Sequence, residues 1–92
     1  MCTMIVEQAD ISGSGKGPKG WFRVDRVNVM FDHPFNLPED HALSIDFVDA
    51  SAGPGARVAV ELTAESGREL VRALLAAIDR GERELGQIAA AS

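Results

Sequence analysis

Two histidines and one cysteine are the residues of this chain whose chemistry is best suited to building a site. His33 and His41 each follow an aspartate, and Pro34 and Pro38 interrupt the segment between them, which is typical of a loop. Neutral imidazole and thiolate are good ligands for zinc and related transition metals. The residue types therefore predict a metal site at Cys2, His33 and His41 if the fold brings these side chains together.

Carboxylates near these residues offer further metal ligands, namely Asp32, Asp40 or Glu65. The spacing of the two histidines matches no compact ligand motif, so an alternative stays open. In that alternative the aspartate and histidine side chains hydrogen-bond the loop backbone, and Cys2 is a buried, inert thiol. An adjacent Asp-His pair cannot readily act as a catalytic couple, because neighbouring side chains of extended backbone point to opposite faces.

A second candidate is the glycine-rich stretch from residue 12 to residue 20, which carries Lys16 and Lys19. Glycines let backbone N–H groups approach an anion, so the two lysines suggest anion or nucleotide binding. The match to a phosphate-binding loop is poor, because Gly17 follows the lysine and Pro18 stands where a helix would begin. A flexible hairpin loop is the alternative, with Trp21 either covering the edge of a small core or anchoring a partner.

Composition and charge limit the class of protein. The 92 residues, 46% apolar and 25% charged, indicate a single globular domain spanning 1–92. A net charge of −5 opposes binding to nucleic acid or an anionic membrane. A single cysteine, no signal peptide and no long apolar run lead us to expect a cytoplasmic protein. A chain this short buries a small core, so a homo-oligomer, most simply a dimer, is expected.

Hydrophobic periodicity predicts four strands and one helix. Period-two alternation and β-branched residues place strands at about 3–11, 21–32, 42–49 and 57–63. A change of parity at Asp25-Arg26 predicts a β-bulge there. Apolar residues at helical spacing then predict an amphipathic helix at about 65–80, capped by Thr63 or Ser66, with a weaker helical tail at 82–90 beyond Gly81.

This order of elements predicts an α+β fold, a four-stranded antiparallel meander with the C-terminal helix packed on one face. The helix is expected to cover Leu43, Ile45, Phe47, Val58, Val60 and Leu62, while part of the other face meets another subunit. Counting along the meander places Cys2, His33, His41 and the start of the helix at one end. Lys16 and Lys19 belong to the opposite end.

Several segments together resemble a family of short bacterial proteins catalogued only as a domain of unknown function. They are Met-Cys-Thr at 1–3, Gly-Ser-Gly-Lys-Gly at 13–17, Gly-Trp-Phe at 20–22, Phe-Asp-His-Pro at 31–34 and Arg-Val-Ala-Val-Glu-Leu at 57–62. The resemblance implies a free-standing bacterial cytoplasmic protein and brings no catalytic residue with it.

No residue pattern points to a catalytic mechanism, so a non-enzymatic role is favoured. The sequence predicts a homo-oligomeric binding or structural module. A metal-binding protein with its site at Cys2, His33 and His41 and an anion- or nucleotide-binding protein at the Gly-Lys loop remain the alternatives.

Overall fold

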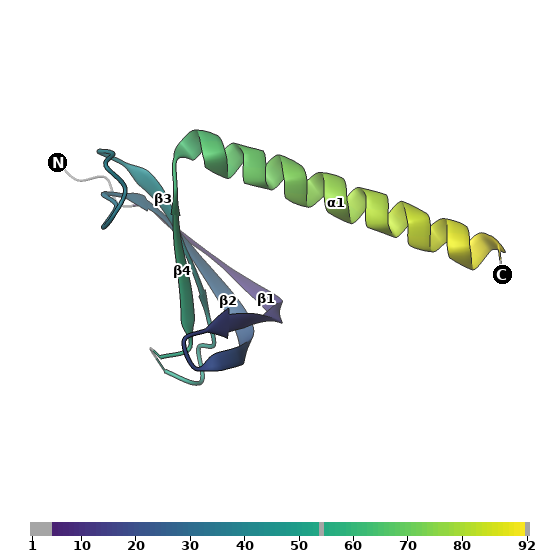
Figure 1. The fold of residues 1–92 in the computed structure, drawn as a ribbon, viewed down its shortest axis with the longest axis horizontal. Helices are drawn as coiled ribbons and strands as arrows, with labels where there is room; N and C mark the ends of the chain where they lie inside the picture. The colour runs from purple at the N-terminus through teal and green to yellow at the C-terminus, as the bar shows by residue number, and fades with distance from the viewer. Residues whose placement is uncertain (1–4, 54, 92) are drawn as a thin grey trace.

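The structure, a computed structural model, describes residues 5–53 and 55–91. Its elements are β1 (Ile5–Gly17), β2 (Gly20–Asp32), β3 (Ala42–Val48), β4 (Arg57–Leu62) and α1 (Ala64–Ala91). The strands form one antiparallel sheet in the order β1-β2-β3-β4, and the helix follows the last strand (Figure 1). The predicted α+β arrangement, a meander followed by one C-terminal helix, is confirmed.

The first strand is longer than predicted, because the glycine-rich stretch expected to be a loop is paired. Gly13 to Gly17 continues β1 against β2, and only Pro18 and Lys19 form the turn. Gly20, at φ 109°, has the left-handed backbone that such a tight turn requires and that other residues rarely adopt. Apolar and polar residues do not alternate in a glycine-rich segment, so the sequence did not predict a strand here, although these glycines pair as well as other residues.

The expected irregularity near Asp25 exists but lies on the other strand. Asp10 pairs with Arg26 and Gly13 with Val24, so β1 has one residue more than β2 in this interval. The extra residue bends the hairpin, whose distal half curls toward the start of β4 (Figure 1). The predicted bulge at Asp25-Arg26 was therefore wrong in its strand, because a parity change cannot tell which of two paired strands carries the insertion.

One face of the sheet, here called the apolar face, is formed by alternate residues that the strand register brings together. Its members are Ile5, Glu7, Ala9, Val27, Val29, Phe31, Leu43, Ile45, Phe47, Val58, Val60 and Leu62. Ile45, at its centre, is 8% exposed, whereas Ile5 and Val60 are more than a third exposed. The described residues therefore cover this face only in part.

The helix is one continuous element, not a helix followed by a weak tail. Ser66 N–H donates to Thr63 Oγ1 at 3.1 Å, the cap that the sequence predicted. No break occurs at Gly81, because alanines, glutamates and leucines on both sides favour helix. The described helix does not include a stretch both long and apolar enough to cross a membrane.

The helix does not pack along the sheet, and this part of the prediction was wrong. Only its first turns touch the strands, where Gly67 is buried against Leu43. Thr63 alone links β4 to α1, so the direction of the helix is set within one residue, and the remaining turns extend away from the sheet (Figure 1). With 28 residues the helix is about 42 Å long, and the molecule measures 57 × 31 × 20 Å.

Candidate functional site

The predicted Asp-His loop brings both histidines together. The ring centroids of His33 and His41 lie 5.0 Å apart at an interplanar angle of 24°, and His41 also stacks on Phe31 at 5.9 Å. The pairing follows from the register, because Phe31 and Asp32 pair with Leu43 and Ala42 and so place the flanking residues at the same end. Two imidazoles therefore share this end of the sheet, in a near-parallel stack.

The carboxylates predicted as further ligands do not form a cluster with this stack in the described part of the chain. Asp32 Oδ1 accepts a hydrogen bond from the N–H of His33 at 2.8 Å, which is the loop-stabilising role that the alternative predicted. Asp40 lies in the loop and Glu65 in the first turn of α1. Among residues 5–53 and 55–91, no three His, Cys, Asp or Glu side chains come close enough to hold a metal. Cys2 lies outside the described residues.

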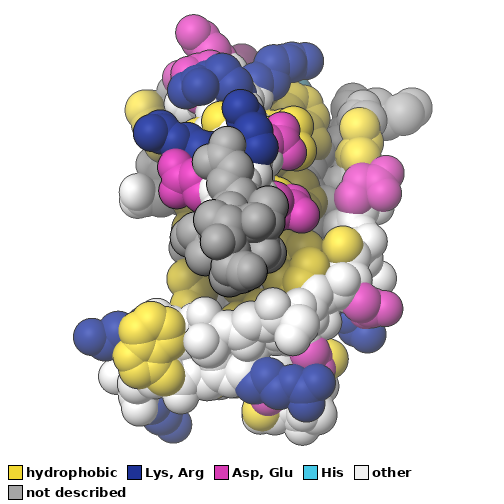
Figure 2. All heavy atoms as spheres, turned by 90° about the vertical axis from the view of Figure 1, so that its right-hand side faces the viewer, with side chains coloured by type: hydrophobic (Ala, Val, Ile, Leu, Met, Phe, Trp, Pro, Cys, Tyr) yellow, Lys and Arg dark blue, Asp and Glu magenta, His cyan; other side chains and the backbone are white. Residues whose placement is uncertain are grey.

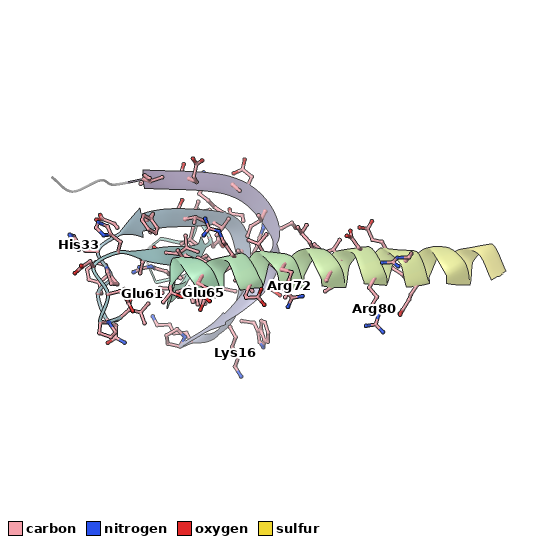
Figure 3. The ribbon with its side chains drawn as sticks, turned by 90° about the horizontal axis from the view of Figure 1, so that it is seen from above. Lys16, His33, Glu61, Glu65, Arg72 and Arg80 are labelled. Atoms are coloured by element: carbon pink, nitrogen blue, oxygen red, sulfur yellow. The ribbon has the colours of Figure 1, made fainter. Side chains whose placement is uncertain are left out.

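The sequence missed the residue that fixes this loop, Glu61 of β4. Its carboxylate accepts hydrogen bonds from the backbone N–H groups of Phe35, of Asn36 at 2.9 Å and of Leu37 at 3.1 Å. These hydrogen bonds, with that of Phe35 contributing most, hold the pKa of Glu61 below its ordinary value. Figure 3 shows Glu61 and His33 at the same end of the sheet. The only signal in the sequence was indirect, because loop N–H groups without strand partners need acceptors.

The loop held by Glu61 exposes an aromatic side chain to solvent. Phe35 is 98% exposed, although its own backbone N–H is held by Glu61. Beneath the loop, on the face opposite the apolar face, lies a hollow of about 190 Å³ lined by Met30, Asp32, His33, Phe35, Ser44, Asp46, Arg57, Ala59, Val60 and Glu61. Arg57 and Asp46 in its wall form an ion pair at 3.1 Å, so these two charges are already compensated.

Lys16 and Lys19 lie at the opposite end of the sheet, on the β1–β2 hairpin. Both side chains are exposed, and Lys16 points away from the sheet and from the helix (Figure 3). The hairpin turn borders a hollow of about 250 Å³ whose lining also includes Ala52, Gly55 and Ala56 of the β3–β4 loop. The structure thus separates the two sequence-predicted sites by the length of the sheet.

The exposed surface of the helix is apolar on one side, and this exposure was not predicted. The helix carries a stripe of large apolar side chains between 40% and 67% exposed, comprising Leu70, Val71, Leu74, Leu75, Ile78 and Leu85. Leu74 follows the buried Gly67 by two helical turns, so the stripe points to the side on which the helix meets the sheet. Figure 2 shows apolar side chains lining the space between the helix and the curled hairpin. We call this space, bounded by the stripe and the apolar face, the wedge.

Comparison with known proteins adds a family without adding an activity. A model of a family described as being of unknown function, DUF6295, matches residues 1–87. No curated protein and no solved structure matches the chain.

Proposed function

The chain belongs to the DUF6295 family of unknown function, and we propose that it acts as a non-catalytic homodimeric module in which each copy fills the wedge of the other. The observation that carries the proposal is the exposure of the helix stripe beside an incompletely covered sheet face. Burial of apolar surface is the main driving force of folding and association, so two such surfaces on one small chain favour a partner.

The surface area of the chain supports a partner of substantial size. A compact protein of 9.8 kDa exposes about 5,200 Å², whereas this chain exposes 7187 Å². Its radius of gyration is 16.3 Å, against about 12 Å for a compact domain of this length. The excess surface of about 2,000 Å² per chain exceeds the roughly 800 Å² that each partner buries in a standard stable interface.

A second copy of the chain is the simplest occupant of the wedge, because it requires no other protein. The stripe and the apolar face belong to one chain and border one wedge, so a two-fold axis can place the helix of each copy on the sheet of the other. Such an isologous contact buries both surfaces twice with a single set of residues. The helix is long enough for this, because most of its roughly 42 Å extends beyond its own sheet.

The test is a mass measurement in solution on matched helix variants. Light scattering at micromolar concentration should give about twice the 9.8 kDa chain mass for the wild type. Leu74→Glu places a charge in the stripe and should give monomers, whereas Ala76→Glu places the same charge on the opposite side of the helix and should leave the dimer intact. Circular dichroism of each variant reports whether the helix is retained. A monomeric wild type, or a dimeric Leu74→Glu protein, would overturn the proposal.

The stacked histidines favour a second candidate, a transition-metal site completed by Cys2. Their 5.0 Å centroid separation brings two imidazoles to one end of the sheet, and a thiolate with two imidazoles suits zinc. Elemental analysis of untagged protein purified without chelator tests this candidate, beside the His33→Ala and Cys2→Ser variants. About one metal per chain, lost in both variants, would support it. Metal-free protein whose melting temperature stays unchanged when zinc, nickel, iron or copper is added would exclude it.

A further inference from the structure

The end of the β1–β2 hairpin is positively charged on a chain that is otherwise strongly acidic. Residues 11–24 contain Lys16, Lys19 and Arg23 and no acidic side chain. The rest of the chain holds the other six basic and all fourteen acidic residues. The net charge of −5 therefore conceals a local excess of +3, and it does not exclude an anionic ligand at this end of the sheet.

The strand register places the charges around the only tryptophan. Lys16 pairs with Trp21 and Ser14 with Arg23, so these four side chains share one face of the hairpin. The alternate residues, including Gly15, Gly17 and Phe22, belong to the other face, where positions 15 and 17 lie close to the Phe22 ring. Trp21 is consequently 71% exposed. An indole plane flanked by cations is thus displayed outward, and Figure 2 shows dark blue side chains beside an apolar one at this end.

The cations of this face are available for a ligand. Within the described residues none of Lys16, Lys19 and Arg23 forms an ion pair, whereas Arg26, Arg57, Arg72 and Arg80 each do. Hydrogen bonds from Ser51 are the main cause that lowers the pKa of Asp49, and the charge of Arg23 contributes less. The neighbouring hollow of about 250 Å³ is lined largely by glycine, alanine and proline, so a ligand can approach the backbone closely.

We infer that this hairpin face binds a ligand that joins a nucleobase to phosphate, with Trp21 as the stacking plane and Lys16, Lys19 and Arg23 as the phosphate contacts. Aromatic side chains stack bases without regard to sequence, and lysine and arginine neutralise phosphates. Arg23 pairs with Ser14, which lies two residues before Lys16 in β1. Arg23 and Lys16 are therefore roughly 7 Å apart along the strand direction, since each residue rises about 3.3 Å. That length suits a nucleoside polyphosphate or one to two nucleotides of a single strand, which share this chemistry.

The single tryptophan supplies the readout. The indole N–H signal of Trp21 is followed by NMR while full-length protein is titrated with adenosine triphosphate, with a ten-nucleotide single-stranded DNA, or with inorganic triphosphate. We expect saturable shifts with at least one base-containing ligand, weakened about tenfold in the Lys16→Gln, Lys19→Gln double variant and in high salt. Arg80→Gln removes one positive charge from the helix and should leave the titration unchanged.

The three ligands separate the sources and can overturn the inference. Tighter binding of the oligonucleotide than of adenosine triphosphate would identify a single strand as the ligand, and the reverse would identify a nucleotide. Equal shifts with inorganic triphosphate would refute the stacking role of Trp21, and no shift at millimolar ligand would refute the site. The hairpin site does not require the dimer, because Lys16 points away from the helix. The mass of each sample is measured separately, so loss of ligand binding can be told apart from loss of the dimer.

Discussion

The loop from residue 33 to residue 41 and the helix α1 are held in place in opposite ways. The loop has no regular secondary structure, but Glu61 of another strand fixes three of its backbone N–H groups. The helix is regular over 28 residues, but only its first turns contact the sheet. Regularity and tertiary anchoring are therefore separate properties here, and the irregular segment is the better anchored.

The difference matters because an isolated helix gains little from its own hydrogen bonds. Most helical stability in proteins comes from packing an apolar side against other elements. The loop obtains its acceptors from its own chain, whereas the large apolar side chains of the stripe remain 40% to 67% exposed. The comparison predicts that changes in the stripe act through a second chain and that changes at Glu61 act within one.

The largest effect is expected for Leu74→Glu in the stripe. Losing the burial of one leucine removes about 2–3 kcal/mol, which corresponds to a fall in melting temperature of roughly 10–20 °C for a domain of this size. The wild-type melting temperature should also rise with protein concentration, because association stabilises the folded chain by mass action. Calorimetry over a hundredfold range of concentration measures both effects.

The control for this prediction is Ala76→Glu, which should keep the wild-type dependence on concentration. If the melting temperature of the wild type is the same at every concentration, the helix is stable without a second chain. The helix would then not need a second chain for its stability, and in this respect it would not differ from the loop.

Glu61→Gln should release the loop with a smaller and local effect. The neutral amide retains one acceptor oxygen and cannot bind three N–H groups as a carboxylate does. Hydrogen exchange at Phe35, Asn36 and Leu37 should become roughly tenfold faster, while exchange in the centre of β3 stays unchanged. Glu39→Gln, in the same loop, is the matched control and should leave these amides as they are. Equal acceleration throughout the sheet would mean that Glu61 stabilises the whole fold and not the loop alone.

Lowering the pH should reproduce this release. The hydrogen bonds from Phe35, Asn36 and Leu37 lower the folded-state pKa of Glu61, so the stabilisation is fully present above the unfolded value of roughly 4.3. It is lost as the pH falls below that value and through the folded pKa. After correction for intrinsic exchange, protection of the three amides should be flat from neutral pH to about 5 and fall below 4.3. In Glu61→Gln the same amides should show no such fall, and a fall in the variant would assign the titration to another carboxylate.

The strands and the helix could be predicted from the sequence, because alternation in Leu43-Ile45-Phe47 and helical spacing in Leu70-Leu74-Ile78 are local signals. Pairing of the glycine-rich half of β1 could not be predicted, since glycine carries no such signal. The direction of α1 depends on the backbone at Thr63 and on the close approach of Gly67 to Leu43, neither of which is a pattern. The direction of the helix and this close approach depend on the three-dimensional structure and are not encoded in a local pattern.

The candidate site divides in the same way. The approach of His33 to His41 followed from counting residues along a meander, because strand register fixes which residues share an end. Glu61 escaped notice because it alternates with Val60 and Leu62 like any solvent-facing residue of a strand. Its role depends on where a proline-containing loop turns back, which no local periodicity encodes.

The smallest effect is expected where the helix leaves the sheet, at Gly67. Replacing a helical glycine by alanine stabilises a helix by about 0.5–1 kcal/mol. A Cβ at position 67 would lie 2.7 Å from Leu43 Cδ2, so this gain is offset by displacement of the leucine side chain. Gly86 has nothing within 4 Å and lies on the polar side of the same helix, so Gly86→Ala should show the full gain. Chemical denaturation of the two variants should therefore differ by up to about 1 kcal/mol. Equal gains would show that the contact between Gly67 and Leu43 is loose and that the start of α1 is no better anchored than its end.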